Sequence, residues 1–151
     1  MNATLKISVG ELVAFCCRSG DLGSSGIPVT AQEGIRAHLK IQRKYSGQAI
    51  AEQSIKLTTV VDEFDIELGG RIDLLFNNEI PPKIQELKTV RRLNRHETPS
   101  SQDDLFADNN NLHWAQVKCY AACYAIENKL PQVQVSLNYI ELNDDSEHEQ
   151  I

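Results

Sequence analysis

The sequence predicts an α/β (α+β) domain in which helices flank a mixed central β-sheet. Two observations support this class. Capping-box residues and apolar positions at helical spacing indicate helices in the first third of the chain and again after residue 111. Between these parts, residues 51–89 alternate apolar and polar side chains with the period of a strand. A chain of 151 residues accommodates one such domain with a single core.

Each of the first two expected helices begins at a capping box. Residues 8–11, Ser-Val-Gly-Glu, precede the apolar residues of the first helix. Residues 30–33, Thr-Ala-Gln-Glu, start a second helix that is expected to run to about Tyr45. The stretch 20–26 between the two helices is rich in glycine and serine, which predicts a loop.

Three strands are expected in the middle of the chain. Residues 55–58 alternate in the first strand, and residues 64–76 continue the pattern on both sides of a Gly-Gly pair. A turn is expected at residues 77–82, which contain two adjacent prolines. Residues 83–89 then form a short strand whose apolar content predicts a central position in the sheet.

The last third of the chain predicts one helix and one strand. A polar stretch, 91–111, comes first and has the length of a functional or disordered loop. The helix is expected from about Leu112 to Lys129, before Pro131, and residues 132–142 form the final strand. Its apolar stripe is expected at six positions: Leu112, Ala115, Cys119, Ala122, Ile126 and Leu130.

The domain is expected to span residues 1–142, and the acidic residues 143–151 to form a tail or the start of a linker to a further domain. The formal net charge of −6 argues against a free-standing protein that binds nucleic acid tightly, since phosphate contacts need Lys and Arg. It leaves room for enzymes whose bound cations reverse the charge of clustered carboxylates. The sequence contains no membrane-length apolar run and no secretory signal, so a cytoplasmic protein is expected.

Asp73 and the triplet Glu86-Leu87-Lys88 form the most informative pattern, and they lie on two expected strands. Because side chains alternate along a strand, Glu86 and Lys88 share one face while Leu87 points into the opposite, buried layer. If the strands are neighbours, the two carboxylates form an oxygen-rich site suited to Mg²⁺ or Mn²⁺, with Lys88 beside it. The alternative is a solvated strand face, where charged side chains are common.

These residues resemble the signature of the PD-(D/E)XK nuclease superfamily. Residues 70–76, GRIDLLF, followed by residues 84–89, IQELKT, are similar to its two catalytic motifs. Residues 33–38, EGIRAH, resemble a helical motif of the RecB-like branch, and residues 116–120, QVKCY, resemble the Q-x-x-x-Y motif of that branch. The four motifs occur in the expected order.

The resemblance implies a restriction-endonuclease-like core and a division of roles within the site. His38, Asp73 and Glu86 would ligate Mg²⁺ or Mn²⁺, together with the main-chain carbonyl of Leu87. Lys88 would be the catalytic lysine. For His38 the alternative is an ordinary polar residue on a helix.

Further residues are candidates for the substrate side of the site. Gln116 and Tyr120 would orient the active site or touch DNA, although Tyr120 alternatively packs in the core. Arg71 next to the catalytic aspartate has two open readings, a phosphate contact or an ion pair with an acid. The residues expected to contact DNA phosphates are Arg71, Arg91, Arg92 and Arg95.

The chain has four cysteines, Cys16, Cys17, Cys119 and Cys123. Some relatives hold an iron–sulfur cluster with one N-terminal and three C-terminal cysteines, and the two-and-two arrangement here does not match that pattern. No cluster is therefore expected. The remaining histidines, His96, His113 and His148, match no motif and are expected at the surface.

Two N-terminal stretches, 9–13 and 17–22, resemble nuclease domains fused ahead of DinG-like, XPD-related helicases. Together the resemblances imply a metal-dependent deoxyribonuclease that acts in DNA repair on single-stranded DNA. Its expected partners are DNA and a helicase domain in the same or a partner chain, without a membrane. Two alternatives stay open: a non-catalytic DNA-binding or docking module with the same fold, and an RNA-processing nuclease that shares every motif.

Overall fold

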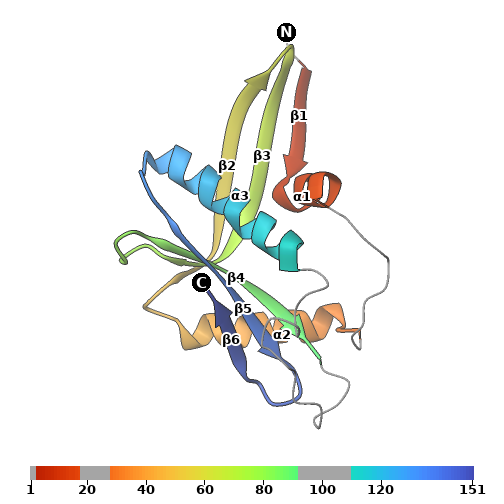
Figure 1. Cartoon of the computed structure of the whole chain (residues 1–151), viewed down its shortest axis with the longest axis vertical. Helices are drawn as coiled ribbons and strands as arrows, with labels where there is room; N and C mark the ends of the chain where they lie inside the picture. The colour runs from red at the N-terminus through yellow and green to blue at the C-terminus, as the bar shows by residue number, and fades with distance from the viewer. Residues whose placement is uncertain (1–2, 18–27, 92–109) are drawn as a thin grey trace.

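A computed structural model describes residues 3–17, 28–91 and 110–151 of the chain. These residues form an open, mixed sheet of six strands with helices on both faces, which confirms the predicted α/β (α+β) class (Figure 1). The strands are β1 (Ala3–Ser8), β2 (Ile50–Val61), β3 (Phe64–Phe76), β4 (Lys83–Val90), β5 (Gln134–Glu141) and β6 (Glu147–Gln150). The helices are α1 (Val9–Cys17), α2 (Ala31–Lys44) and α3 (Asn110–Asn128).

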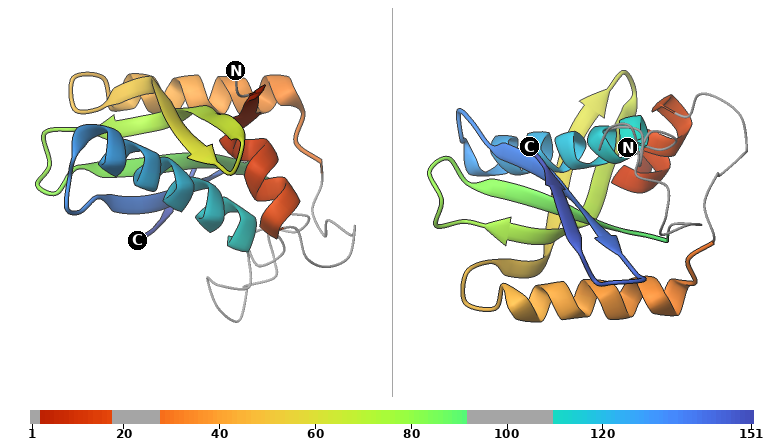
Figure 2. Two further views of the ribbon diagram at one scale, coloured as in Figure 1. Left: turned by 90° about the horizontal axis from the view of Figure 1, so that it is seen from above. Right: turned by 60° about the horizontal axis from the view of Figure 1, so that its bottom comes forward.

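The helices lie in two layers, one on each face of the sheet (Figure 2). α1 and α3 cover one face, where Val13 and Val117 join Ile72 in the larger core cluster. α2 covers the opposite face, where Ile41 and Leu87 belong to the smaller cluster. Leu87 therefore faces away from the side chains on either side of it, as the strand alternation predicted.

The sheet forks along β3. β2 pairs with β3 over nearly its whole length and so occupies one edge of that strand. The other edge is shared, because β1 pairs in parallel with residues 64–69 and β4 pairs antiparallel with residues 74–76. Residues 70–73 have no strand partner on this edge among the described residues. The fork thus leaves room beside Arg71 and Asp73 that neighbouring strands do not fill.

β1 was not predicted. Its residues carry few large apolar side chains, and most of them are exposed. The strand forms because residues 64–69 of β3 offer it a parallel edge. These residues are distant from β1 in the sequence. The apolar–polar pattern of six residues does not reveal a partner strand at that distance.

The predicted acidic tail is wrong for residues 147–150, which form β6 and pair antiparallel with β5. The acidic side chains of β6 are stabilised by hydrogen bonds to polar residues rather than by burial of apolar surface. Glu147 accepts a hydrogen bond from Asn138 at 2.8 Å, and Glu149 accepts one from Gln85 at 2.8 Å. A strand stabilised in this way lacks the apolar alternation that sequence analysis searches for.

The helix predicted from Leu112 to Lys129 is α3, but part of its predicted apolar stripe is wrong. Ala122 is exposed and Ile126 is 60% exposed, whereas Val117 and Cys123 are buried. The helix carries apolar residues on several sides, so spacing alone did not select the face that packs on the sheet.

Several predictions lie outside the described residues. They concern the loops at 20–26 and 92–109, including Arg92, Arg95 and His96. Among the helices that the structure describes, none combines the length and the apolar character needed to cross a membrane.

Candidate active site

α2 places His38 over the fork. The helix begins at the predicted capping box, in which Thr30 Oγ1 accepts a hydrogen bond from the Glu33 backbone N–H at 3.3 Å. The backbone N–H of Thr30 donates in return to the Glu33 carboxylate at 3.0 Å. Ala37 and Ile41 pack in the cluster under the helix, which leaves His38 at the edge of that contact, facing the site.

β3 and β4 bring the two predicted acids together. The last antiparallel pair before the fork joins Leu74 to Gln85, so Asp73 and Glu86 are the next residues on each strand. Beyond that pair the Asp73 carboxylate accepts a hydrogen bond from the Leu87 backbone N–H at 2.8 Å. This bond replaces the strand ladder and fixes Asp73 beside Glu86.

A local irregularity in β3 turns Asp73 toward the site. Ile72 and Leu75 are three residues apart, yet both belong to the cluster beneath α1 and α3. Leu74, between them, belongs to the cluster beneath α2. The regular alternation of side chains is therefore interrupted near Asp73, which allows its carboxylate to face the fork rather than a core.

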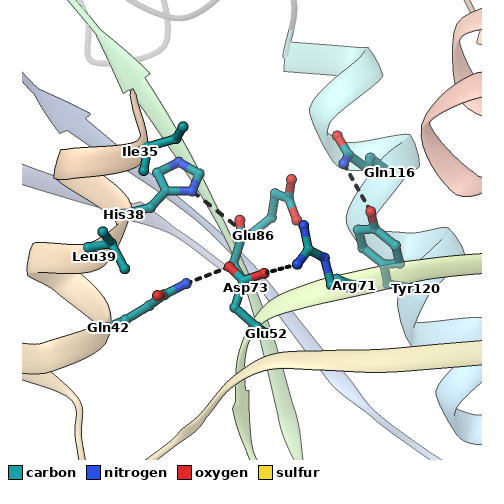
Figure 3. A pocket seen from close by; sticks show the side chains of 10 residues that line it. All are labelled: Ile35, His38, Leu39, Gln42, Glu52, Arg71, Asp73, Glu86, Gln116 and Tyr120. Carbon is teal, nitrogen blue, oxygen red and sulfur yellow. Dashed lines mark hydrogen bonds and ion pairs between the residues drawn. The ribbon is translucent and has the colours of Figure 1, made fainter. Parts of the chain in front are cut away.

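The residues of the fork line one cavity of about 450 Å³, and residues from α2, β2, β3, β4 and α3 meet there (Figure 3). The predicted residues among them come from four separate stretches of the sequence. The lining residues are Ile35, His38, Leu39, Gln42, Glu52, Arg71, Asp73, Glu86, Gln116 and Tyr120.

The two acids share a largely desolvated environment. Burial, followed by the nearby Asp73 charge, raises the pKa of Glu86 to about 7, and only 4% of Glu86 is exposed. Burial also raises the pKa of Asp73, against the opposing effect of the Leu87 N–H bond. Two neighbouring carboxylates that both resist ionisation form a site that a cation would stabilise.

Lys88 joins the acids to α3. Its Nζ donates to Glu86 Oε1 at 2.8 Å and to Gln116 Oε1 at 2.9 Å. Gln116 Nε2 donates in turn to the Tyr120 hydroxyl at 3.3 Å. The predicted lysine, glutamine and tyrosine thus form one hydrogen-bonded chain that begins at Glu86.

Gly70 makes the position of Tyr120 possible. The Tyr120 ring lies against β3, and a Cβ atom added at Gly70 would come within 2.6 Å of Tyr120 Cε1. That separation is far below a van der Waals contact, so a side chain at residue 70 would displace the ring. Tyr120 is buried in the larger core cluster while its hydroxyl reaches the cavity, so it combines the packing and site roles considered above.

The donor set of the cavity fits a hard divalent cation in its chemistry. Asp73 and Glu86 supply carboxylate oxygens, and His38 Nδ1 lies 3.8 Å from Asp73 Oδ1. As they stand, the described residues include no group of three His, Cys, Asp or Glu side chains that could hold a metal ion. Metal binding at this cavity, including the role of the Leu87 carbonyl, therefore stays a prediction.

Of the two predicted arginines that the structure describes, only one lines the cavity. Arg71 lines the cavity, and its NH1 lies 3.2 Å from Glu52 Oε2. Arg91 does not line it and instead forms an ion pair with Glu33 at the start of α2. The Thr30 backbone N–H and Arg91 hold the pKa of Glu33 at about 2. The structure thus ties Arg91 to the helix that carries His38.

Glu52 and Gln42 line the cavity but were not predicted from the sequence. Gln42 follows His38 by one helical turn, so its place in the lining follows from helical spacing. Glu52 carried no signal, because nothing in a strand pattern marks one acid among several. Its position depends on a backbone irregularity that only the structure reveals.

His113 is not the surface residue that was predicted. It is half-buried on α3, and its Nδ1 lies 3.0 Å from the Tyr139 hydroxyl. Burial lowers its pKa to about 4, with a smaller contribution from the charge of Lys88. The cysteines of the described residues are free thiols, two of them exposed on α1 and Cys119 and Cys123 one turn apart on α3.

Comparisons with known proteins support the fold alone. No protein-family model matches the chain, and no curated protein matches it. Among solved structures the chain is similar to the crystal structure of SSO0001, with a TM-score of 0.51 and 19% sequence identity. The similarity covers 76% of this chain and 48% of that chain, so this chain spans about half the length of that protein.

Proposed function

We propose that the cavity at the fork hydrolyses phosphodiester bonds of DNA with the help of a divalent cation, as in PD-(D/E)XK nucleases of the RecB-like branch. One observation carries this proposal. Asp73, Glu86 and Gln116, together with His38, line a single cavity, and Lys88 bonds to two of them. A solvated strand face would not bury an acid and hold a lysine on it in this way.

The metal site would be built from the two acids and the histidine. Asp73 and Glu86 would contribute oxygens and His38 a ring nitrogen, with the Leu87 carbonyl as a further ligand. Bound Mg²⁺ or Mn²⁺ would supply Lewis-acid stabilisation of charge on the phosphate. Since the pKa of Glu86 is raised to about 7, metal affinity should increase as the pH rises through that value.

The chain itself contributes charge and orientation. The Lys88 ammonium is a point charge next to Glu86, placed to stabilise the negative charge that develops on a phosphate in the transition state. Gln116 holds that ammonium through its amide oxygen. Tyr120 accepts a hydrogen bond from Gln116, and its ring packs on Gly70 of β3. It therefore fixes the Lys88–Gln116–Tyr120 hydrogen bonds to the sheet.

The substrate we propose is single-stranded DNA, delivered in the cytoplasm by a helicase domain in the same or a partner chain during repair. The net charge of −6 leaves few cations to hold phosphates, so the isolated chain should bind DNA weakly and lose affinity with salt. Tethering to a motor that holds the strand would raise the local substrate concentration at the cavity.

The experiment is cleavage of circular single-stranded DNA with Mg²⁺ or Mn²⁺, compared with excess chelator. Nicking of the circle would show endonuclease action, and cleavage of linear DNA alone would show exonuclease action. Lys88→Ala should abolish most cleavage. Lys56→Ala is the matched control, because Lys56 is a strand lysine that pairs with Glu67 away from the cavity.

RNA of the same sequence, duplex DNA and forked DNA complete the comparison. Preferential cleavage of the RNA would favour an RNA-processing nuclease. DNA binding without cleavage under any metal would favour a non-catalytic binding or docking module. Tight, sequence-specific cleavage of duplex DNA by the isolated chain would contradict the tethered, single-strand model.

A further inference from the structure

Glu52 has a backbone conformation that is unusual for its position. Its φ is +55°, in the left-handed region, although it lies inside strand β2. The other described non-glycine residues with positive φ lie in connections between elements: Asp62, Lys129 and Asp145. A non-glycine residue held in this region inside a strand is strained, and such strain concentrates at functional sites.

The strain sits opposite the catalytic aspartate. The β2–β3 ladder pairs Ala51 with Leu74 and Gln53 with Ile72, and the pair between them, Glu52 with Asp73, is missing. This is also where the side-chain alternation of β3 is interrupted. The turn of the backbone at Glu52 and the exposure of Asp73 to the cavity are therefore parts of one irregularity.

The Glu52 carboxylate connects three elements at the mouth of the cavity (Figure 3). Its Oε1 accepts a hydrogen bond from Gln42 Nε2 of α2 at 2.8 Å. Its Oε2 lies 3.2 Å from Arg71 NH1 of β3. Both carboxylate oxygens are thus used, one to fix the acid to the helix and the other to hold the arginine.

This contact is too exposed to serve mainly as a stabilising ion pair. The side chains of Arg71 and Glu52 are 70% and 42% exposed, and solvent-exposed pairs contribute little to stability. The strained backbone costs more than such a pair returns. The side chain at residue 52 is better explained by what it positions than by what it stabilises.

Arg71 keeps donors available for a ligand. Glu52 is its one acidic partner among the described residues, and a guanidinium carries five N–H donors. Phosphate groups match these donors in a bidentate geometry. Because Arg71 lines the cavity that also contains Asp73 and Glu86, a phosphate bound by it would lie next to the proposed hydrolytic centre.

We propose that Glu52 is a positioning residue that holds Arg71 at the mouth of the cavity, where the guanidinium binds a phosphate of the nucleic-acid strand being cleaved. This inference rests on the proposed function and deepens it. Arg71 would then have both of the roles considered from the sequence. It would form an ion pair in the free protein and contact a phosphate in the complex.

The test uses Glu52→Gly, Glu52→Gln and Arg71→Ala. Glycine suits a φ of +55°, so Glu52→Gly should leave the Tm unchanged or higher. It should raise the KM for single-stranded DNA roughly tenfold with little change in kcat, as for one lost phosphate contact. Arg71→Ala should raise the KM similarly, and the double variant should be no worse than Arg71→Ala alone.

Glu52→Gln should restore most of the affinity lost in Glu52→Gly, because its amide oxygen can still accept from Arg71 and its NH2 can donate to Gln42 once the Gln42 amide turns its oxygen toward it. Glu67→Gln is the matched control, since that acid pairs with Lys56 on the same hairpin outside the cavity. A lower Tm with an unchanged KM in Glu52→Gly would overturn the inference and make Glu52 a structural residue.

Binding of a fluorescent single-stranded oligonucleotide without divalent metal separates this inference from the proposed hydrolysis. Arg71→Ala and Glu52→Gly should each weaken binding, and Arg71→Ala should reduce the salt dependence by about one phosphate contact. If the wild type cleaves nothing but these shifts occur, hydrolysis fails and the phosphate contact stands. Binding unaffected by both substitutions would overturn the inference even if cleavage is observed.

Discussion

The carboxylate of Asp73 accepts a hydrogen bond from the backbone N–H of Leu87, with 2.8 Å between Oδ2 and N. The bond lies where the β3–β4 ladder ends, so an acid of the proposed metal site also satisfies a backbone donor of the core strand. Asp73 thus contributes to the fold through this hydrogen bond and to the proposed metal site through its charge. Different substitutions of Asp73 can remove the charge alone or both the charge and the hydrogen bond.

Asp73→Ala should be less stable than Asp73→Asn. Both substitutions remove the charge, but only the asparagine retains an oxygen that can accept from Leu87. An unsatisfied buried donor costs about 1–3 kcal/mol, which is the expected difference in the free energy of unfolding in urea. Equal stability of the two variants would mean that water or another group replaces the acceptor.

Gln116→Ala should reduce cleavage through its effect on Lys88. Loss of a supporting hydrogen bond to an active-site group typically costs 10–100-fold, whereas loss of the lysine itself should cost roughly 10²–10³. If the glutamine acts by holding Lys88, the double variant Gln116→Ala/Lys88→Ala should be no slower than Lys88→Ala. Multiplicative losses in kcat would instead show that Gln116 contacts the substrate independently.

Gly70→Ala should damage the site, and Gly69→Ala should not. A Cβ at Gly70 would overlap the Tyr120 ring at 2.6 Å, while a Cβ at Gly69 would meet the Ile55 carbonyl at 3.7 Å, an ordinary contact. We expect Gly70→Ala to lower the Tm and the cleavage rate together, because overpacking moves the ring and with it the Gln116 amide. Similar behaviour of the two variants would show that Tyr120 moves aside without consequence.

His113 should make the protein less stable in mild acid. Its pKa is lowered from 6.5 to about 4 in the folded state, mainly by burial. Above pH 6.5 the imidazole is neutral in both states, and below that value the unfolded chain takes up the proton first. The contribution of His113 to the free energy of unfolding should therefore decrease as the pH drops from 6.5 to about 4.

The measurement is the difference in unfolding free energy between the wild type and His113→Asn, determined in urea from pH 7 to pH 4. Asparagine does not titrate, so acids elsewhere in the chain, including Glu86, cancel in the difference. The wild type should lose stability relative to the variant as the pH falls. A constant difference would contradict a neutral, buried His113.

The proximity of Asp73, Glu86 and Lys88 was more predictable than the edges of the sheet. The strand pattern places Glu86 and Lys88 on one face, with Asp73 on the neighbouring strand. In the structure Asp73 and Glu86 line one cavity with His38, and Lys88 donates to Glu86 at 2.8 Å. Proximity of the strands that hold them follows from the short turn between β3 and β4. Local sequence contains enough information for this part, because the contacts are close along the chain.

The parts that were missed depend on distant partners. β1 and β6 form because of strands remote in sequence or polar partners, not through their own periodicity. His113 is half-buried because Val117 and Tyr120, which lie on its side of α3 and were not in the expected stripe, pack in the core. Glu52 required knowledge of a backbone angle, which residue type does not encode.

The most direct test of the account is calorimetric titration with Mn²⁺ at pH 8, above the Glu86 pKa of about 7. The wild type and Lys88→Ala should both bind the ion, because Lys88 supplies charge rather than a ligand. Asp73→Asn should lose binding while remaining folded, because its amide preserves the Leu87 contact. Mn²⁺ affinity in Asp73→Asn equal to that of the wild type would contradict a metal site at the fork of the sheet.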